Sequence, residues 1–143
     1  MMHLRLNMAT LLILGLLFAG CIEGLYNVKN SPVPKFQNRS LSLDEVKTAI
    51  MRSSGTNNVR YEMSDVEPGL ILCKLFKKRH EALVEIHYSQ ESFSILYQKS
   101  VNLRYAPTSA EGSETISRHY NTWIRNLDES IKRNLASIPS KSQ

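Results

Sequence analysis

Three short segments between residues 59 and 98 place apolar side chains at every second position, a fourth is mostly apolar, and this pattern constrains the fold most strongly. The predicted strands are residues 59–64, 70–76, 82–88 and 93–98. Short strands joined by short turns form an antiparallel meander, and the alternation indicates that one face of that sheet is covered.

Two amphipathic helices flank these strands and are expected to cover that face. Ser42-Leu43-Asp44-Glu45 has the pattern of a capping box and predicts a short helix that ends near Arg52. An N-cap at Ser113 and a long apolar stripe predict a closing helix, which Pro139 cannot continue. The stripe consists of Ile116, Tyr120, Trp123, Ile124, Leu127, Ile131 and Leu135. We therefore predict an α+β fold, an antiparallel three- or four-stranded meander covered on one face by a short N-terminal helix and a long C-terminal helix.

The N-terminal region has the layout of a secretory signal. The apolar run from Met8 to Ala19 has the length of a signal-peptide core and is too short for a helix that crosses a bilayer. Leu17-Phe18-Ala19-Gly20-Cys21 resembles the lipobox of bacterial lipoproteins, in which the cysteine is acylated and becomes the first residue of the mature chain. Cleavage that leaves a free thiol at Cys21 is the alternative, but an exposed thiol is a liability in an oxidising compartment.

These features predict the organisation of the chain. Residues 1–20 are a lipoprotein signal peptide, 21–40 a flexible lipid-anchored tether, 41–138 a single α+β domain and 139–143 a disordered tail. A strand around Leu25-Tyr26-Val28 that docks onto a partner is an alternative to the tether. Ile22 follows the cysteine where an Asp would indicate inner-membrane retention, so the expected location is the periplasmic leaflet of the outer membrane.

The sequence contains no motif that indicates catalysis. A nucleophile elbow, a P-loop, a dinucleotide fingerprint and a paired-histidine metal motif are all missing, so we predict no catalytic residue, cofactor or metal. Three histidines (His80, His87 and His119) are not expected to converge, and Cys73 lies in an apolar strand where a buried thiol acts as a small hydrophobe. We expect Trp123 to fill the space between helix and sheet.

One basic cluster is a candidate binding site. It consists of Lys74, Lys77, Lys78, Arg79 and the adjacent His80. Nucleic acid is excluded by the expected compartment, which leaves an anionic lipid surface, lipopolysaccharide, a glycan or an acidic protein as ligands. The simpler interpretation is a solvated hairpin tip, because runs of charge usually form a solvated face.

Several motifs together resemble a known set of proteins. They are Arg79-His80, Phe93-Ser94-Ile95, Ser100-Val101-Asn102-Leu103 and Tyr120-Asn121-Thr122-Trp123. In this combination the chain is similar to a set of small proteobacterial lipoproteins that have no assigned activity. The resemblance implies the location and the fold but no reaction. The matching segments also contain five polar residues, namely Ser100, Asn102, His119, Tyr120 and Asn121. We interpret these residues first as ones that fix the fold and second as a ligand site.

The expected function is that of a non-catalytic interaction or structural module, anchored to a membrane by acyl chains on Cys21 and able to bind an envelope protein. Two alternatives remain at this point. One is an accessory lipoprotein subunit of an envelope-spanning secretion complex, of the kind found in type IV-like outer-membrane cores. The other is a protein that binds an anionic ligand of the envelope.

Overall fold

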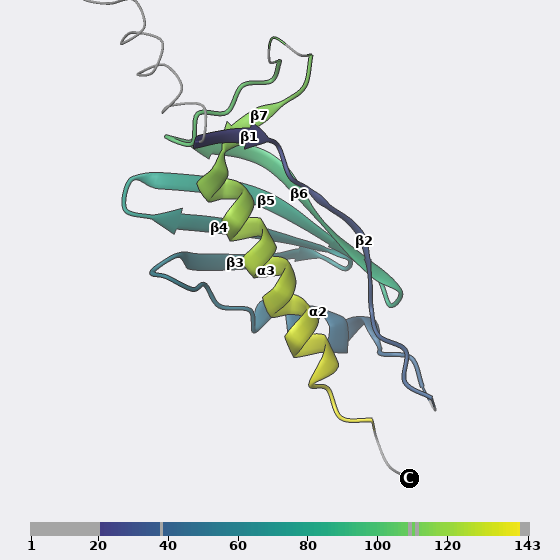
Figure 1. Ribbon diagram of the computed structural model, residues 1–143. Helices are drawn as coiled ribbons and strands as arrows, with labels where there is room; N and C mark the ends of the chain where they lie inside the picture. Colours follow the sequence, from purple (N-terminus) through teal and green to yellow (C-terminus); the bar gives the residue numbers. More distant parts are fainter. Residues whose placement is uncertain (1–20, 38, 109, 111, 141–143) are drawn as a thin grey trace, which may run out of the picture.

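The computed structural model describes residues 21–37, 39–108, 110 and 112–140. The predicted signal peptide and the last three residues of the predicted tail lie outside these described residues. In chain order the elements are β1 (Ile22–Gly24), β2 (Val28–Pro32), α2 (Leu43–Met51), β3 (Arg60–Glu67), β4 (Leu70–Lys77), β5 (His80–Tyr88), β6 (Ser92–Val101), β7 (Thr115–Ser117) and α3 (Arg118–Ala136) (Figure 1).

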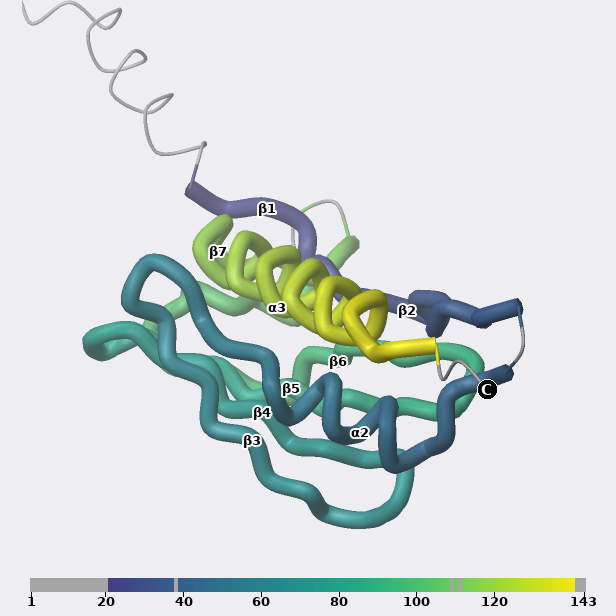
Figure 2. Tube along the Cα trace, turned by 90° about the horizontal axis from the view of Figure 1, so that it is seen from below, coloured from purple at the N-terminus to yellow at the C-terminus, as the bar shows by residue number. Residues whose placement is uncertain are grey.

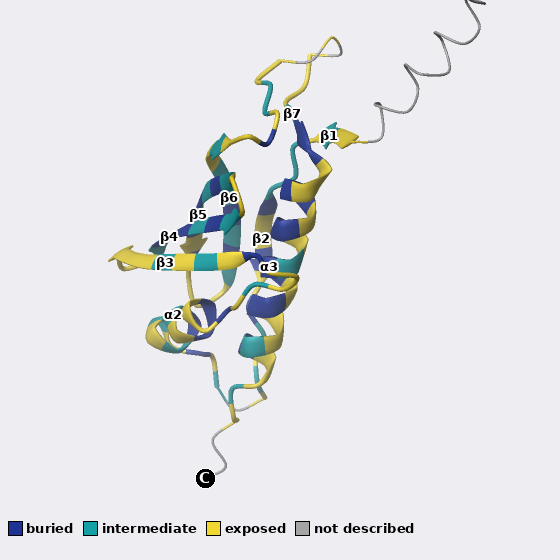
Figure 3. Cartoon of the chain, turned by 90° about the vertical axis from the view of Figure 1, so that its left-hand side faces the viewer, coloured by how far each residue is buried: buried dark blue, intermediate teal, exposed yellow. Residues whose placement is uncertain are grey.

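The α+β prediction is confirmed. Strands β3 to β6 form the antiparallel meander, and β2 adds to β6 to give a five-stranded sheet of order β2-β6-β5-β4-β3. Helix α3 lies along one side of this sheet and turns its buried residues toward it (Figure 3). Helix α2 packs against α3 and β5. The helices thus share one core with a single face of the sheet.

Burial alternates along the strands, also in β4, whose sequence is mostly apolar. Ile71, Cys73 and Leu75 of β4 are fully buried, and Cys73 lies opposite Val84 of β5. The side chains between them, such as Leu72, are partly exposed on the other face. Side chains of a strand point alternately to the two faces, so one covered face produces this pattern. Trp123 of α3 is 6% exposed and belongs to the same core, as predicted.

The prediction of a flexible tether over residues 21–40 is wrong. This segment forms β1, which pairs with β7, and β2, which pairs with the edge of β6. The folded domain therefore begins at Ile22 and not at residue 41, and the sheet has one strand more than predicted. The segment docks onto its own domain, and it shows no alternation because β2 is a short edge strand with a bulge and a terminal proline.

The predicted start of the closing helix is also wrong. Helix α3 begins at Arg118, and its N-cap is Ser117, whose hydroxyl accepts a hydrogen bond from the His119 amide at 3.4 Å. The residues before it form β7, so Ile116 is buried in a strand and not in the helix. Pairing with β1 holds this backbone extended, which a helical pattern of side chains does not reveal.

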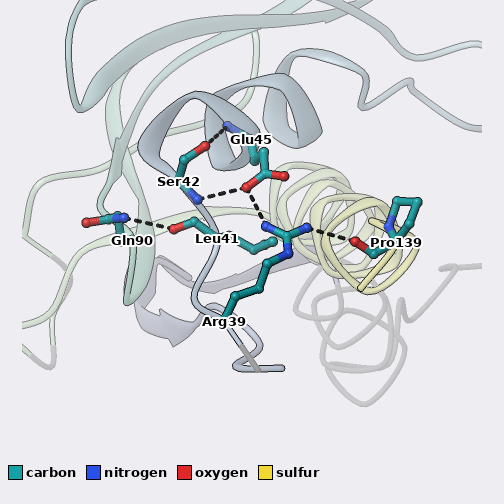
Figure 4. Close-up of polar contacts among 6 residues, drawn as sticks. All are labelled: Arg39, Leu41, Ser42, Glu45, Gln90 and Pro139. Atoms are coloured by element: carbon teal, nitrogen blue, oxygen red, sulfur yellow. Dashed lines mark hydrogen bonds and ion pairs between the residues drawn. The ribbon is translucent and has the colours of Figure 1, made fainter. Parts of the chain in front are cut away.

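The capping box of α2 is present and connects three parts of the chain (Figure 4). The Glu45 amide donates to the Ser42 hydroxyl at 3.2 Å, and the Glu45 carboxylate accepts from the Ser42 amide at 2.9 Å. Arg39 donates to the same carboxylate and to the Pro139 carbonyl, both at 2.7 Å. The hydrogen bond from Arg39 lowers the pKa of Glu45 to about 2. The network ties the start of α2 to the segment after α3.

The Ser42 N-cap is expected to stabilise the folded protein. Ser42→Ala should lower the free energy of unfolding by about 1 kcal/mol, because the Glu45 amide loses its acceptor. Urea denaturation of the purified protein measures the change. Ser40→Ala, an exposed serine two residues earlier, is the matched control and should differ little from the parent. Equal stability of the two variants would show that the cap contributes nothing.

Candidate functional site

Cys21 is exposed and directly precedes the folded domain. Its neighbour Ile22 pairs with Ser117, the N-cap of α3, in the β1–β7 ladder. Consecutive Cα atoms are ~3.8 Å apart, so a group attached to Cys21 is held beside this end of the domain. Among the described residues, no helix combines the length and the apolar character needed to cross a membrane.

Asn121 fastens the first strand to helix α3. Its side chain is 1% exposed, and its amide nitrogen donates to the Gly24 carbonyl at 2.8 Å and to the Glu23 carboxylate at 3.1 Å. Its amide oxygen accepts from the Tyr26 backbone N–H at 3.0 Å. One buried amide thus bonds to three residues of the N-terminal segment. This agrees with the interpretation of Asn121 as a residue that fixes the fold.

The basic cluster lies at the β4–β5 turn. Lys77 pairs with His80, which leaves Lys78 and Arg79 as the exposed turn residues, and Lys78 has a φ of 55°. The ring Nδ1 of His80 lies 2.8 Å from the Asn102 carbonyl, and the Asn102 side chain donates to the Arg79 carbonyl at 2.8 Å. The turn is therefore attached to the chain that follows β6, a contact that the sequence analysis did not predict.

Lys74, which was predicted to belong to this cluster, does not lie in the turn. It lies within β4, where its ammonium group is 3.2 Å from the Glu81 carboxylate and 5.5 Å from the centre of the Phe76 ring. The structure instead places two other cations at the same end of the sheet, Arg104 after β6 and Arg118 at the start of α3. Both are exposed. They lie far from the turn in sequence, so charge clustering along the chain could not reveal them.

The sheet face opposite the helices carries a second candidate surface, which we call the open face. It presents partly exposed leucines from β4, β5 and β6, namely Leu72, Leu83 and Leu96. Leu83 lies between Lys74 and Lys99 in the register of the sheet, and a bulge in β6 shifts that register beside it. A hollow of about 330 Å³ opens there, lined on its apolar side by Leu83 and Val101.

The groups that catalysis would need are separated in the described part of the chain. Burial raises the pKa of the Cys73 thiol to about 12, so the nucleophilic thiolate is scarce at neutral pH. His80 bonds to Asn102, and His87 lies on the exposed face of β5 with its ring 2.7 Å from Glu85. Over the described residues, no three His, Cys, Asp or Glu side chains lie close enough together to hold a metal ion.

The other polar positions of the resemblance are placed as follows. The Ser100 hydroxyl lies 2.9 Å from the Tyr97 hydroxyl, and the Tyr97 ring stacks on Tyr105 with the ring centres 4.5 Å apart. Tyr120 is fully buried and meets the Tyr97 ring edge-on at 5.5 Å. His119 is exposed at the start of α3. Tyr97, Tyr105 and Tyr120 thus form one aromatic cluster, which joins β6 to α3.

Comparisons with known proteins found no family model, no curated protein and no solved structure that matches this chain. The resemblance to small proteobacterial lipoproteins therefore stays a prediction from the sequence motifs.

Proposed function

We propose that this chain is a bacterial lipoprotein that acts as a non-catalytic interaction module of the cell envelope. Acyl chains on Cys21 attach it to a membrane, and we place it on the periplasmic leaflet of the outer membrane. The observation that supports this most directly is the position of Cys21. It ends the lipobox-like sequence, it is exposed, and the first strand begins at the next residue.

The physical chemistry of acylation supports a stable anchor. Each buried CH₂ group contributes ~0.8 kcal/mol, so one acyl chain binds marginally and two or three chains bind durably. Because Ile22 already lies in the β1–β7 ladder, no flexible linker separates the acyl chains from the domain. Such a protein would sit directly on the bilayer.

The open face supports an interaction role over catalysis. Leu72, Leu83 and Leu96 leave apolar surface without a covering element among the described residues, and lysines and glutamates surround it. Protein interfaces combine an apolar centre with a polar rim in this way. An active site would instead need convergent titratable groups in a pocket, whereas Cys73 is buried away from the histidines.

Acylation of Cys21 is the decisive test. Wild-type protein expressed in a Gram-negative host should incorporate labelled palmitate and fractionate with membranes, and Cys21→Ala should do neither. Cys73→Ala is the matched control, since that thiol is fully buried, and it should label like the wild type. A wild-type protein that does not label, or a Cys21→Ala variant that does, would contradict the proposal.

A further inference from the structure

The two ends of the sheet differ in the charges that they carry. One end, where β4 and β6 finish and β5 and α3 begin, carries five cations, which we call the basic end: Lys77, Lys78, Arg79, Arg104 and Arg118. Arg60 also lies at this end and stacks on the Phe76 ring, and two carboxylates lie there with partners of their own, Glu81 beside Lys74 and Glu23 beside Asn121. The opposite end, where β3 and β5 finish and β4 and β6 begin, carries Asp65, Glu67 and Glu91, and we call it the acidic end.

The two ends also differ in how their charges are paired. At the acidic end Lys47 lies 3.2 Å from Asp65 and 3.3 Å from Asp44, and Arg39 lies 2.7 Å from Glu45. At the basic end, none of the five cations has a carboxylate of the described residues within 4.0 Å. Helix α3 has no acidic residue in its first turn, so its dipole adds to the positive field there.

The basic end is also the end that carries Cys21. Ile22 pairs with Ser117, whose amide donates to the Leu103 carbonyl at 2.8 Å. The preceding residue, Asn102, holds the β4–β5 turn through the Arg79 carbonyl. A chain of direct contacts thus joins Cys21 to the turn. In Figure 1 the β4–β5 turn lies at the left and β1 at the top, and the C-terminal segment lies at the bottom. Figure 2 also shows β1 and the C-terminal segment on opposite sides of the molecule.

We propose that the basic end rests on the anionic phospholipid headgroups of the membrane that holds the acyl chains. This inference builds on the proposed lipid anchor. The anchor keeps the five cations at the bilayer surface, and their attraction to lipid phosphates selects one orientation of the domain. The strands then point away from the membrane, so the open face and the acidic end stay accessible to a partner.

The expected strength follows from the number of charges. A Lys or Arg held near an anionic bilayer strengthens binding by ~1 kcal/mol, which is about a fivefold change in the binding constant. The five cations together act as a second attachment that the acyl chains alone do not supply. The attraction weakens as salt screens it over ~10 Å at 0.1 M ionic strength.

The test uses the mature chain from residue 21 with Cys21→Ser, which retains every other described residue and binds only through its surface. Flotation with vesicles of phosphatidylethanolamine and phosphatidylglycerol, mixed two to one, measures the binding constant. Pure phosphatidylcholine vesicles are the neutral comparison. Lys78→Gln with Arg79→Gln removes two exposed cations from the basic end. Lys35→Gln with Arg133→Gln removes two exposed cations elsewhere and is the matched control.

We expect binding to the anionic vesicles only, a loss of about tenfold or more in the basic-end variant and a change of less than about twofold in the control. Added salt should weaken the binding of the parent protein. Equal losses in the two double variants, or equal binding to both kinds of vesicle, would overturn the proposal. Absence of binding would overturn it as well, and would favour an acidic protein as the ligand. Palmitate labelling of the wild type reports on the anchor separately, so failure of the anchor and failure of this orientation are distinguishable.

Discussion

Replacing Trp123 with alanine is expected to lower the free energy of unfolding by about 3–5 kcal/mol. The side chain is 6% exposed and lies between the fully buried Tyr120 and Ile124 on the face of α3 that covers the sheet. Truncation loses the transfer free energy of the indole and leaves a cavity that the surrounding core fills only in part. The free energy of unfolding of a domain of this size is about 5–15 kcal/mol, so the variant should be only marginally stable.

Thermal melts of the unacylated mature chain measure this effect. We expect the Tm of Trp123→Ala to fall by about 10–20 °C. Glu129→Ala, on the exposed side of the same helix, is the control and should melt close to the parent. A Trp123→Ala protein that melts within about 2 °C of the parent would show that the indole is not a core element, because that shift is well under 1 kcal/mol. The chain used must begin at residue 21, since β1 and β2 belong to the fold.

Replacing Asn121 should release the N-terminal segment from α3. Asn121→Ala leaves the Gly24 carbonyl and the Tyr26 amide without their protein partner, and we expect a loss of about 2–3 kcal/mol. Hydrogen exchange at the Tyr26 amide should accelerate more than exchange in the β4–β5 ladder, because the β1–β2 segment opens locally. In the lipid-anchored form that we propose, a loose segment would then join the acyl chains to the domain, and the proposed orientation would be lost.

Asn121→Asp separates hydrogen bonding from packing at this position. Aspartate has nearly the same shape and still accepts from the Tyr26 amide, but it cannot donate to the Gly24 carbonyl, and its charge faces the Glu23 carboxylate. We expect this variant to be at least as unstable as Asn121→Ala. Asn126→Ala is the control, because Asn126 is a half-buried asparagine on the same helix whose side chain donates to the Thr56 hydroxyl at 3.2 Å. Wild-type stability of Asn121→Asp would contradict the role of the amide.

Local patterns were sufficient for the central part of the fold. Alternation predicted β3, β5 and β6, because a sheet with one covered face buries every second side chain of a strand. The mostly apolar run at residues 70–76 predicted β4, with Cys73 buried as a small hydrophobic residue. The capping box predicted α2 because the interaction joins residues only three positions apart. The apolar stripe predicted α3 and the burial of Trp123 for the same reason: each of these signals is contained in a short stretch of chain.

Long-range contacts decided the parts that the sequence analysis missed. β1, β2 and β7 are held by backbone hydrogen bonds to distant segments, and backbone groups carry no signature in the amino-acid pattern. The β1–β7 pairing keeps residues 115–117 extended, so the N-cap of α3 is Ser117 and not the predicted Ser113.

The candidate site also depends partly on local sequence patterns and partly on long-range contacts. The sequence itself determined the lipobox-like run that ends at Cys21 and the cations of the β4–β5 turn. Only the tertiary structure placed Arg104 and Arg118 at the end of the sheet that carries that turn, and removed Lys74 from it. Only the tertiary structure fixed Cys21 beside them, through Ile22 and Ser117. The reason is physical: charges far apart in the chain meet where strands end, and strand pairing sets which ends coincide.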